Sequence, residues 1–203
     1  MTSFFTSDLH IGHANIIKYM DRPYASVAEM NDDMVERWNS VVTADDDVII
    51  VGDLAMGKLD ESLAYVSLLN GTKYLIPGNH DRMFGCKETK YTNACQRYLD
   101  AGIRAVLNSR VELALPKVTN VLVTHFPYAG DSREGPDRYE DHRPPDLGRF
   151  LVHGHTHGLW RRSGRMVDVG VDAWAGYPVS WGSVAELLLS DEDHAEPLEW
   201  KRV

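Results

Sequence analysis

The chain has 203 residues, of which 43% are hydrophobic and 25% charged, and its formal net charge is -9. This length and apolar fraction predict one folded domain over residues 1–203 and exclude a disordered chain. The acidic balance argues against a broad basic surface for gripping long nucleic acids. The sequence contains no run of about 18 apolar residues, which a membrane span would need, and no signal peptide is visible. Two cysteines are too few for a disulfide framework, so we expect a cytoplasmic protein with no membrane contact.

Short apolar runs recur along the chain, and each of them ends in a polar cluster. In chain order, these predicted strands are Ser3–Thr6, Asp47–Val51, Tyr74–Ile76, Val121–Val123 and Phe150–Val152. Each polar cluster that follows contains Asp, Asn or His. Sites in open α/β sheets lie outside the carboxyl ends of the strands, so we expect five strand ends to converge on one site.

Helical patterns separate the early strands, as expected for an α/β fold. The range Ser26–Ser40 carries apolar residues at helical spacing, and Ser26 with Glu29 matches a capping box at its start. Weaker helical patterns cover Asp60–Leu69 and Asn93–Ala101.

The later part of the chain, from Ile103 on, predicts mostly strands, among them Met166–Val171 and Val184–Leu189. The segment Tyr128–Leu147 has no periodicity and contains three Pro and two Gly. A structureless loop of this length is uncommon unless it is a functional lid or is disordered. It follows His125 directly, so we predict an active-site loop over residues 128–147 rather than a solvated excursion.

The polar clusters supply oxygen and imidazole groups and no thiolate. They contain Asp8, His10, Asp53, Asn79, His80, His125, His155 and His157. Such groups suit divalent Mn, Fe, Co, Ni or Zn, and they exceed the three or four ligands of one catalytic ion. Seven of these groups are strong ligands, and two ions about 3.5–4 Å apart that share a carboxylate would use all seven and would suit displacement at phosphorus. A nearby acid would then protonate the leaving oxygen.

At these positions the sequence resembles the calcineurin-like metallophosphoesterase superfamily. Five blocks carry the resemblance in the family's order: Asp8-Leu9-His10, Gly52-Asp53, Gly78-Asn79-His80-Asp81, Thr124-His125 and Gly154-His155-Thr156-His157. The segment Val169–Trp174 looks like the one that follows the last block in small bacterial and phage-type members. A single block is weak, whereas the ordered set is specific. The resemblance implies a four-layer α/β/β/α sandwich, with two mixed sheets flanked by helices.

The resemblance also implies a role for each matching residue. Asp8, His10 and His157 would hold one metal ion, Asn79, His125 and His155 would hold a second, and Asp53 would bridge both. His80 would contact the phosphate and the leaving group as a catalytic residue, and Asp81 would orient it. The expected cofactors are two divalent transition-metal ions, with Mn first and Fe, Ni, Co or Zn as alternatives.

Two further residues near the blocks are candidates for substrate binding. His13 either touches substrate or caps a helix that starts near Ala14. Arg82 could meet a phosphate, although it also fits a solvated surface charge. One departure from the family is Leu54-Ala55-Met56, which stands where many relatives have an acidic or polar residue.

Three functions fit this pattern. We favour hydrolysis of small phosphodiesters, with cyclic nucleotides as candidates and phosphomonoesters as further substrates, through metal-bound hydroxide. The second function is that of a nuclease or nucleic-acid end-processing enzyme, which the low Lys and Arg count argues against. The third is a non-catalytic, metal-stabilised binding or scaffold protein, which the retention of His80 and Asp81 argues against. The expected partner is a small phosphoester, and the aromatic stretch Trp174–Trp181 is either core or a homodimer contact.

Overall fold

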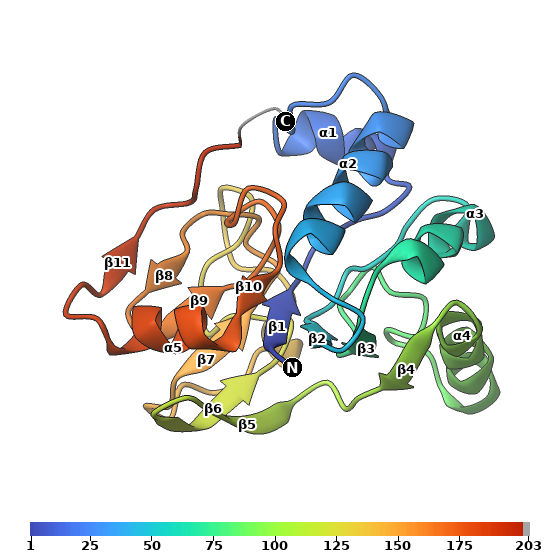
Figure 1. Cartoon of the computed structure of the whole chain (residues 1–203). Coiled ribbons are helices and arrows are strands. Elements are labelled where there is room, and N and C mark those ends of the chain that lie inside the picture. The colour runs from blue at the N-terminus through green and yellow to red at the C-terminus, as the bar shows by residue number, and fades with distance from the viewer. Residues whose placement is uncertain (201–203) are drawn as a thin grey trace.

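The computed structural model describes residues 1–200 and contains two mixed β-sheets flanked by helices (Figure 1). This arrangement confirms the predicted α/β class. The first sheet has the order β10-β1-β2-β3-β4, formed by Val179–Ser180, Ser3–Thr6, Asp47–Ile50, Thr72–Leu75 and Ile103–Val106. The second has the order β11-β8-β9-β7-β6-β5, formed by His194–Ala195, Arg162–Ser163, Met166–Asp168, Leu151–His153, Val118–Val123 and Val111–Leu115.

Parallel strands at the centre of each sheet bring the polar clusters together. In the first sheet β1, β2 and β3 run parallel, and in the second β6, β7 and β9 do so. An isolated parallel bridge between Ser7 and Gly170 joins the end of β1 to the segment that follows β9. The backbone N–H of Val171 donates to the Ser7 carbonyl at 3.0 Å. The carboxyl ends of strands from both sheets therefore meet at one junction.

Four helices pack on the first sheet: α1 (Ala14–Tyr19), α2 (Val27–Val41), α3 (Leu59–Ala64) and α4 (Glu88–Asp100). A 3-10 turn, η1 (Tyr65–Leu68), extends α3. The core on this side includes Trp38 of α2, which is buried with Val48 and Ile50 of β2. The predicted capping box is present, because the Ser26 hydroxyl accepts from the Glu29 N–H at 3.1 Å. Helix α2 is thus fixed at its start by a local signal and along its length by burial.

Helix α5 (Trp181–Leu189) corrects the strand predicted at Val184–Leu189. The Ser180 hydroxyl accepts from the Ser183 N–H at 3.0 Å and caps this helix. Val184 and Leu188 are buried in the core that the two sheets share. A short apolar run does not by itself distinguish a buried strand from a buried helix, and here the cap decides.

The predicted loop over residues 128–147 connects β6 to β7 and contains one 3-10 turn, η2 (Glu140–His142). Among the described residues, no helix combines the length and apolar character that a bilayer crossing requires.

Candidate metal centre

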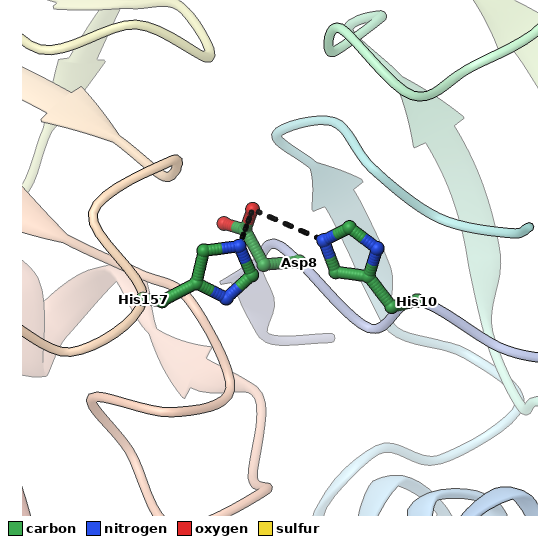
Figure 2. Close-up of side chains that lie close together, drawn as sticks. All are labelled: Asp8, His10 and His157. Atoms are coloured by element: carbon green, nitrogen blue, oxygen red, sulfur yellow. Dashed lines mark ion pairs between the residues drawn. The ribbon is translucent and has the colours of Figure 1, made fainter. Parts of the chain in front are cut away.

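The side chains predicted as metal ligands converge where the two sheets meet. Asp8 and His10 follow β1, Asp53 follows β2, Asn79 follows β3, His125 follows β6, and His155 and His157 follow β7. Figure 2 shows the Asp8 carboxylate between the imidazoles of His10 and His157. Its Oδ1 atom lies 3.8 Å from His10 Nε2 and 3.6 Å from His157 Nε2. One carboxylate thus faces two imidazoles that are far apart in the sequence.

A second group of side chains lies beside the first. Asp53 Oδ2 lies 3.6 Å from His10 Nε2 and 3.5 Å from His125 Nε2. Asn79 Oδ1 lies 3.1 Å from both His125 Nε2 and His155 Nδ1. Asp53 is therefore the carboxylate that lies between the His10 group and the His125 group.

The chemistry of these atoms fits divalent cations. Asp8 Oδ1 and His10 Nε2 are buried and have no hydrogen-bond partner within residues 1–200, which is uncommon for buried polar atoms. Separations of 3.5–3.8 Å are too long for hydrogen bonds. Atoms bound at about 2.0–2.2 Å to one ion lie about 3–3.6 Å apart, close to what is seen. Among the described residues, two sets of side chains have ligand atoms that all lie within 4.8 Å of one another: Asp8, His10 and His157, and Asp8, Asp53 and His125.

The backbone at these residues adopts the left-handed conformation, which is uncommon outside glycine. The φ angles are 57° at Asp8, 51° at His10, 54° at Asp53, 72° at His155 and 50° at His157. Residues held in such conformations cost about 1–3 kcal/mol each and persist where the surrounding structure enforces them, often at functional sites. Five of the seven predicted ligands show this strain.

Two glycines in the blocks allow the loops to approach closely. A Cβ atom on Gly154 would lie 2.0 Å from Ser7 Oγ and 2.3 Å from Asp8 Oδ2. A Cβ on Gly78 would lie 2.3 Å from Asp53 Oδ1. These distances are far inside van der Waals contact, so no other residue fits without displacing a predicted ligand.

The family model described as calcineurin-like phosphoesterase matches residues 1–159. The chain belongs to this family. It is similar to the Gene 66 protein of Mycobacterium phage L5, with 33% identity over 200 residues, which covers 92% of this chain and 93% of that protein. It is also similar to the Gene 66 protein of Mycobacterium phage D29, with 38% identity over 184 residues, which covers 84% and 88%. The fold is shared with a protein of unknown function, AQ665 from Aquifex aeolicus, at a TM-score of 0.66 and 21% identity, over 92% of this chain and 98% of that one.

In this metallophosphoesterase, three of the four candidate histidine ligands have one ring nitrogen close to an oxygen. His157 Nδ1 lies 2.8 Å from Asp172 Oδ2, and His155 Nε2 lies 3.2 Å from Asp131 Oδ2. His125 Nδ1 donates to the Val51 carbonyl at 2.8 Å. Partners of this kind fix which nitrogen carries the proton and leave the other one free for a metal ion.

His10 departs from this pattern, because its Nδ1 faces the Met56 sulfur at 3.3 Å. Met56 belongs to the Leu54-Ala55-Met56 segment that follows Asp53. A thioether sulfur thus lies beside Nδ1 of His10, whereas the other three candidate histidine ligands have an oxygen at the corresponding place.

Asp172 is held in turn by Arg22, a residue to which the sequence alone assigned no role. The Arg22 guanidinium donates to both Asp172 oxygens at 2.8 Å and to the carbonyls of Asp8 at 2.8 Å and Leu9 at 3.0 Å. Burial alone would raise the pKa of Asp172, but Arg22 and His157 hold it at about 2. Asp172 therefore remains a carboxylate that accepts from His157.

Some candidate ligands already have the charge state that suits metal binding, whereas His125 and His157 would have to give up a proton. Burial alone would lower the pKa of both rings, but the Asp53 carboxylate outweighs burial and raises that of His125 to about 10, and Asp8 raises that of His157. Burial lowers the pKa of His10 to about 4 and that of His155 to about 3, so both rings are neutral near pH 7. Burial would also raise the pKa of Asp53, but the neighbouring His125 keeps it below its usual range. Neutral imidazoles and ionised carboxylates are the forms that bind cations.

His80 lies outside the two groups of candidate ligands. Its ring is exposed and lies 5.2 Å from the His10 ring and 6.4 Å from the His13 ring, centroid to centroid. Its backbone N–H donates to Asp53 Oδ1 at 2.8 Å. The position of His80 is therefore tied to the carboxylate that lies between the two ligand groups.

Asp81 lies beneath the loops that carry Asp53 and Gly78. Its carboxylate accepts from the backbone N–H groups of Asp53 and Gly78 at 2.9 Å and of Leu54 at 3.2 Å, and from the Tyr98 hydroxyl at 3.2 Å. Burial first and the Asp53 carboxylate second raise the pKa of Asp81. These contacts make Asp81 the group that holds two ligand-bearing loops together, whereas orientation of the His80 ring is not among its hydrogen bonds.

A cavity of ≈ 180 Å³ lies over the site and is lined by candidate ligands, by His80 and by two further groups of residues. The first comprises His13, Ile16, Tyr19 and Met20 around α1, and the second comprises Ser132, Arg133 and Arg138 from the 128–147 loop. His13 precedes α1 but its side chain does not cap the helix. Arg82 is exposed, donates to the Gly57 carbonyl at 3.2 Å and is not among the lining residues.

Proposed function

We propose that this phosphoesterase uses two divalent ions, with Mn first, to hydrolyse small phosphodiesters such as cyclic nucleotides, and phosphomonoesters as well. The observation that carries the proposal is that His10, whose buried Nε2 atom has no hydrogen-bond partner within residues 1–200, lines a cavity of ≈ 180 Å³ together with other candidate ligands. This volume is below the roughly 300–1,000 Å³ of common small-molecule sites, so it would hold the phosphoester group of a substrate whose larger substituent, such as a nucleoside, extends beyond the cavity.

Asp8, His10 and His157 are proposed to hold one ion, Asn79, His125 and His155 the other, and Asp53 to bridge the two. Divalent ions bound there would polarise the phosphoryl oxygens and lower the pKa of a bound water. The ligands' contribution is to fix this geometry in advance, because Asp172, Asp131 and the Val51 carbonyl restrain three of the four imidazoles.

His80 is proposed to complete the reaction. When water attacks phosphorus and the bond to the leaving oxygen breaks, the His80 ring donates a proton to that oxygen. Histidine is the side chain best suited to give and take a proton near neutral pH. The place of His80 at the cavity, outside the ligand groups, supports this role.

Arg133 supports an anionic substrate. It lines the cavity, and within residues 1–200 it forms no ion pair or hydrogen bond, whereas Arg138 and Arg143 pair with Asp131. One cation at the cavity thus remains free for a phosphate oxygen, in a chain whose net charge is -9.

A metal-supplemented substrate panel tests the proposal. We expect hydrolysis of 2′,3′-cyclic AMP and of bis(p-nitrophenyl) phosphate in the presence of Mn²⁺, with slower release of nucleotides from single-stranded DNA. Faster degradation of DNA would favour the nuclease instead. Retention of metal without turnover of any diester or monoester would favour the scaffold protein.

A further inference from the structure

The 128–147 loop contains one buried carboxylate, Asp131, whose residue is 7% exposed. Its Oδ2 atom lies 3.2 Å from His155 Nε2. We propose that Asp131 is a positioning residue for His155, and that through this contact the loop and the ion held by His155 stabilise each other. The proposal rests on the two-ion site proposed above.

The two ring nitrogens of His155 face different groups. Nδ1 lies 3.1 Å from Asn79 Oδ1 and so faces the candidate ligand group, whereas Nε2 faces Asp131. A proton on Nε2 that is donated to Asp131 leaves the lone pair of Nδ1 free for an ion. Ligating histidines generally donate their other N–H to a carboxylate or carbonyl in this way. Without Asp131, nothing at Nε2 selects this tautomer.

Two arginines of the same loop hold the Asp131 carboxylate. Arg138 Nη2 lies 2.5 Å from Oδ1, and Arg138 Nε lies 3.0 Å from Oδ1 and 3.1 Å from Oδ2. The Arg138 backbone N–H also donates to Oδ2 at 3.1 Å, and Arg143 Nη2 lies 3.5 Å from the same oxygen. The carboxylate that meets His155 is therefore also the group that closes the loop on itself.

The ring of His155 packs against two aromatic side chains. Tyr139, from the same loop, packs with its ring centroid 5.6 Å from that of His155, and Phe126 packs at 5.1 Å. Tyr139 has a φ of 59°, so the loop holds it in an uncommon backbone conformation. The loop thus contacts His155 at one nitrogen and at the ring. Because coupling between two equilibria is reciprocal, ordering of the loop favours metal binding and metal binding favours ordering of the loop.

The simpler interpretation is that Asp131 serves only its own loop. Asp137 provides the comparison, because its Oδ2 accepts from the Gly130 N–H at 2.9 Å and lies 3.6 Å from Arg143 Nη1. Asp137 therefore closes the same loop but has no contact with a candidate ligand among the described residues. Removing each carboxylate separates the two roles.

The test measures bound Mn²⁺ per chain for wild type, Asp131→Ala and Asp137→Ala, by equilibrium dialysis and elemental analysis. We expect two ions in wild type, and in Asp131→Ala a loss of about 10–100-fold in affinity for one of them. Asp137→Ala should bind both ions as wild type does. Asp131→Asn, which keeps an acceptor oxygen, should recover part of the lost affinity even if the alanine variant folds poorly.

Tryptic cleavage after Arg133 gives a readout that does not depend on activity. Mn²⁺ should slow this cleavage in wild type and in Asp137→Ala, and should leave it unchanged in Asp131→Ala. Two tightly bound ions in all three proteins, or equal losses in both alanine variants, would contradict the role of Asp131 but not the two-ion site. One ion in wild type would contradict the two-ion site and the proposal with it.

Discussion

At the scale of single residues, the site separates groups arranged for metal binding from a group that stays free. The candidate ligands are mostly buried, and three of their four imidazoles have an oxygen partner at one ring nitrogen. His80 is exposed, and its backbone rather than its ring contacts Asp53. This difference in environment supports the proposal that His80 transfers a proton and that the others coordinate metal.

Replacing His80 by alanine tests that assignment. We expect His80→Ala to retain its metal content and to lose about 10²–10⁴-fold in kcat with a poor leaving group, such as the ribose alkoxide of a cyclic nucleotide. The loss should be much smaller with p-nitrophenolate, which departs without protonation. The comparison is made by steady-state kinetics on both substrates.

His194→Ala is the matched control, because His194 is exposed in β11 and pairs with Glu196 at 2.9 Å. It should behave as wild type. Equal losses with both leaving groups in His80→Ala would exclude general acid catalysis by this ring.

The seven candidate ligands could be predicted because each belongs to a short block with a fixed spacing. The groups that orient them could not, since their contacts join distant parts of the chain. Arg22 meets Asp172 across 150 residues, and Asp131 meets His155 from the middle of a loop without periodicity. Asp172 did stand in a segment that resembled the family, although nothing local showed that it would meet His157.

At the scale of elements, strand ends and the tight turns after them determine the site. Strand positions were predictable from apolar runs, as β1, β2 and β7 show. Helix α5 was not, because its apolar run at 184–189 fits both helix and strand until Ser180 is recognised as its cap. The contacts of Asp81 with backbone N–H groups were not predictable either, because no sequence pattern reveals them.

Glycine in the turn after β7 offers a test at this scale. In Gly154→Ala the new Cβ would lie 2.3 Å from Asp8 Oδ2, so Asp8 must move. We expect weaker metal binding and a lower free energy of unfolding, measured by metal titration and by urea denaturation. The size of the stability loss should be about 1–3 kcal/mol, as for other overpacked sites.

Gly182→Ala in α5 is the control, because the added Cβ meets only Ser180 Oγ at 3.6 Å. It should leave metal binding unchanged and stabilise the helix by up to about 1 kcal/mol. Normal metal affinity in Gly154→Ala would show that the close approach of the two loops is not needed for the site.

At the scale of the whole molecule, the site lies where two sheets meet. The bridge from Ser7 to Gly170 and the ion pair of Arg22 with Asp172 connect the end of β1 to the segment after β9. Metal ions at this junction would link the polar ends of strands from both sheets.

The central claim, two ions sharing Asp53, is tested most directly by the metal content of wild type and of Asp53→Ala after loading with Mn²⁺. The account predicts two ions per chain in wild type, and loss of metal together with diesterase activity in the variant, because Asp53 Oδ2 lies between His10 and His125. A single ion in wild type, or full metal content and activity in Asp53→Ala, would contradict it.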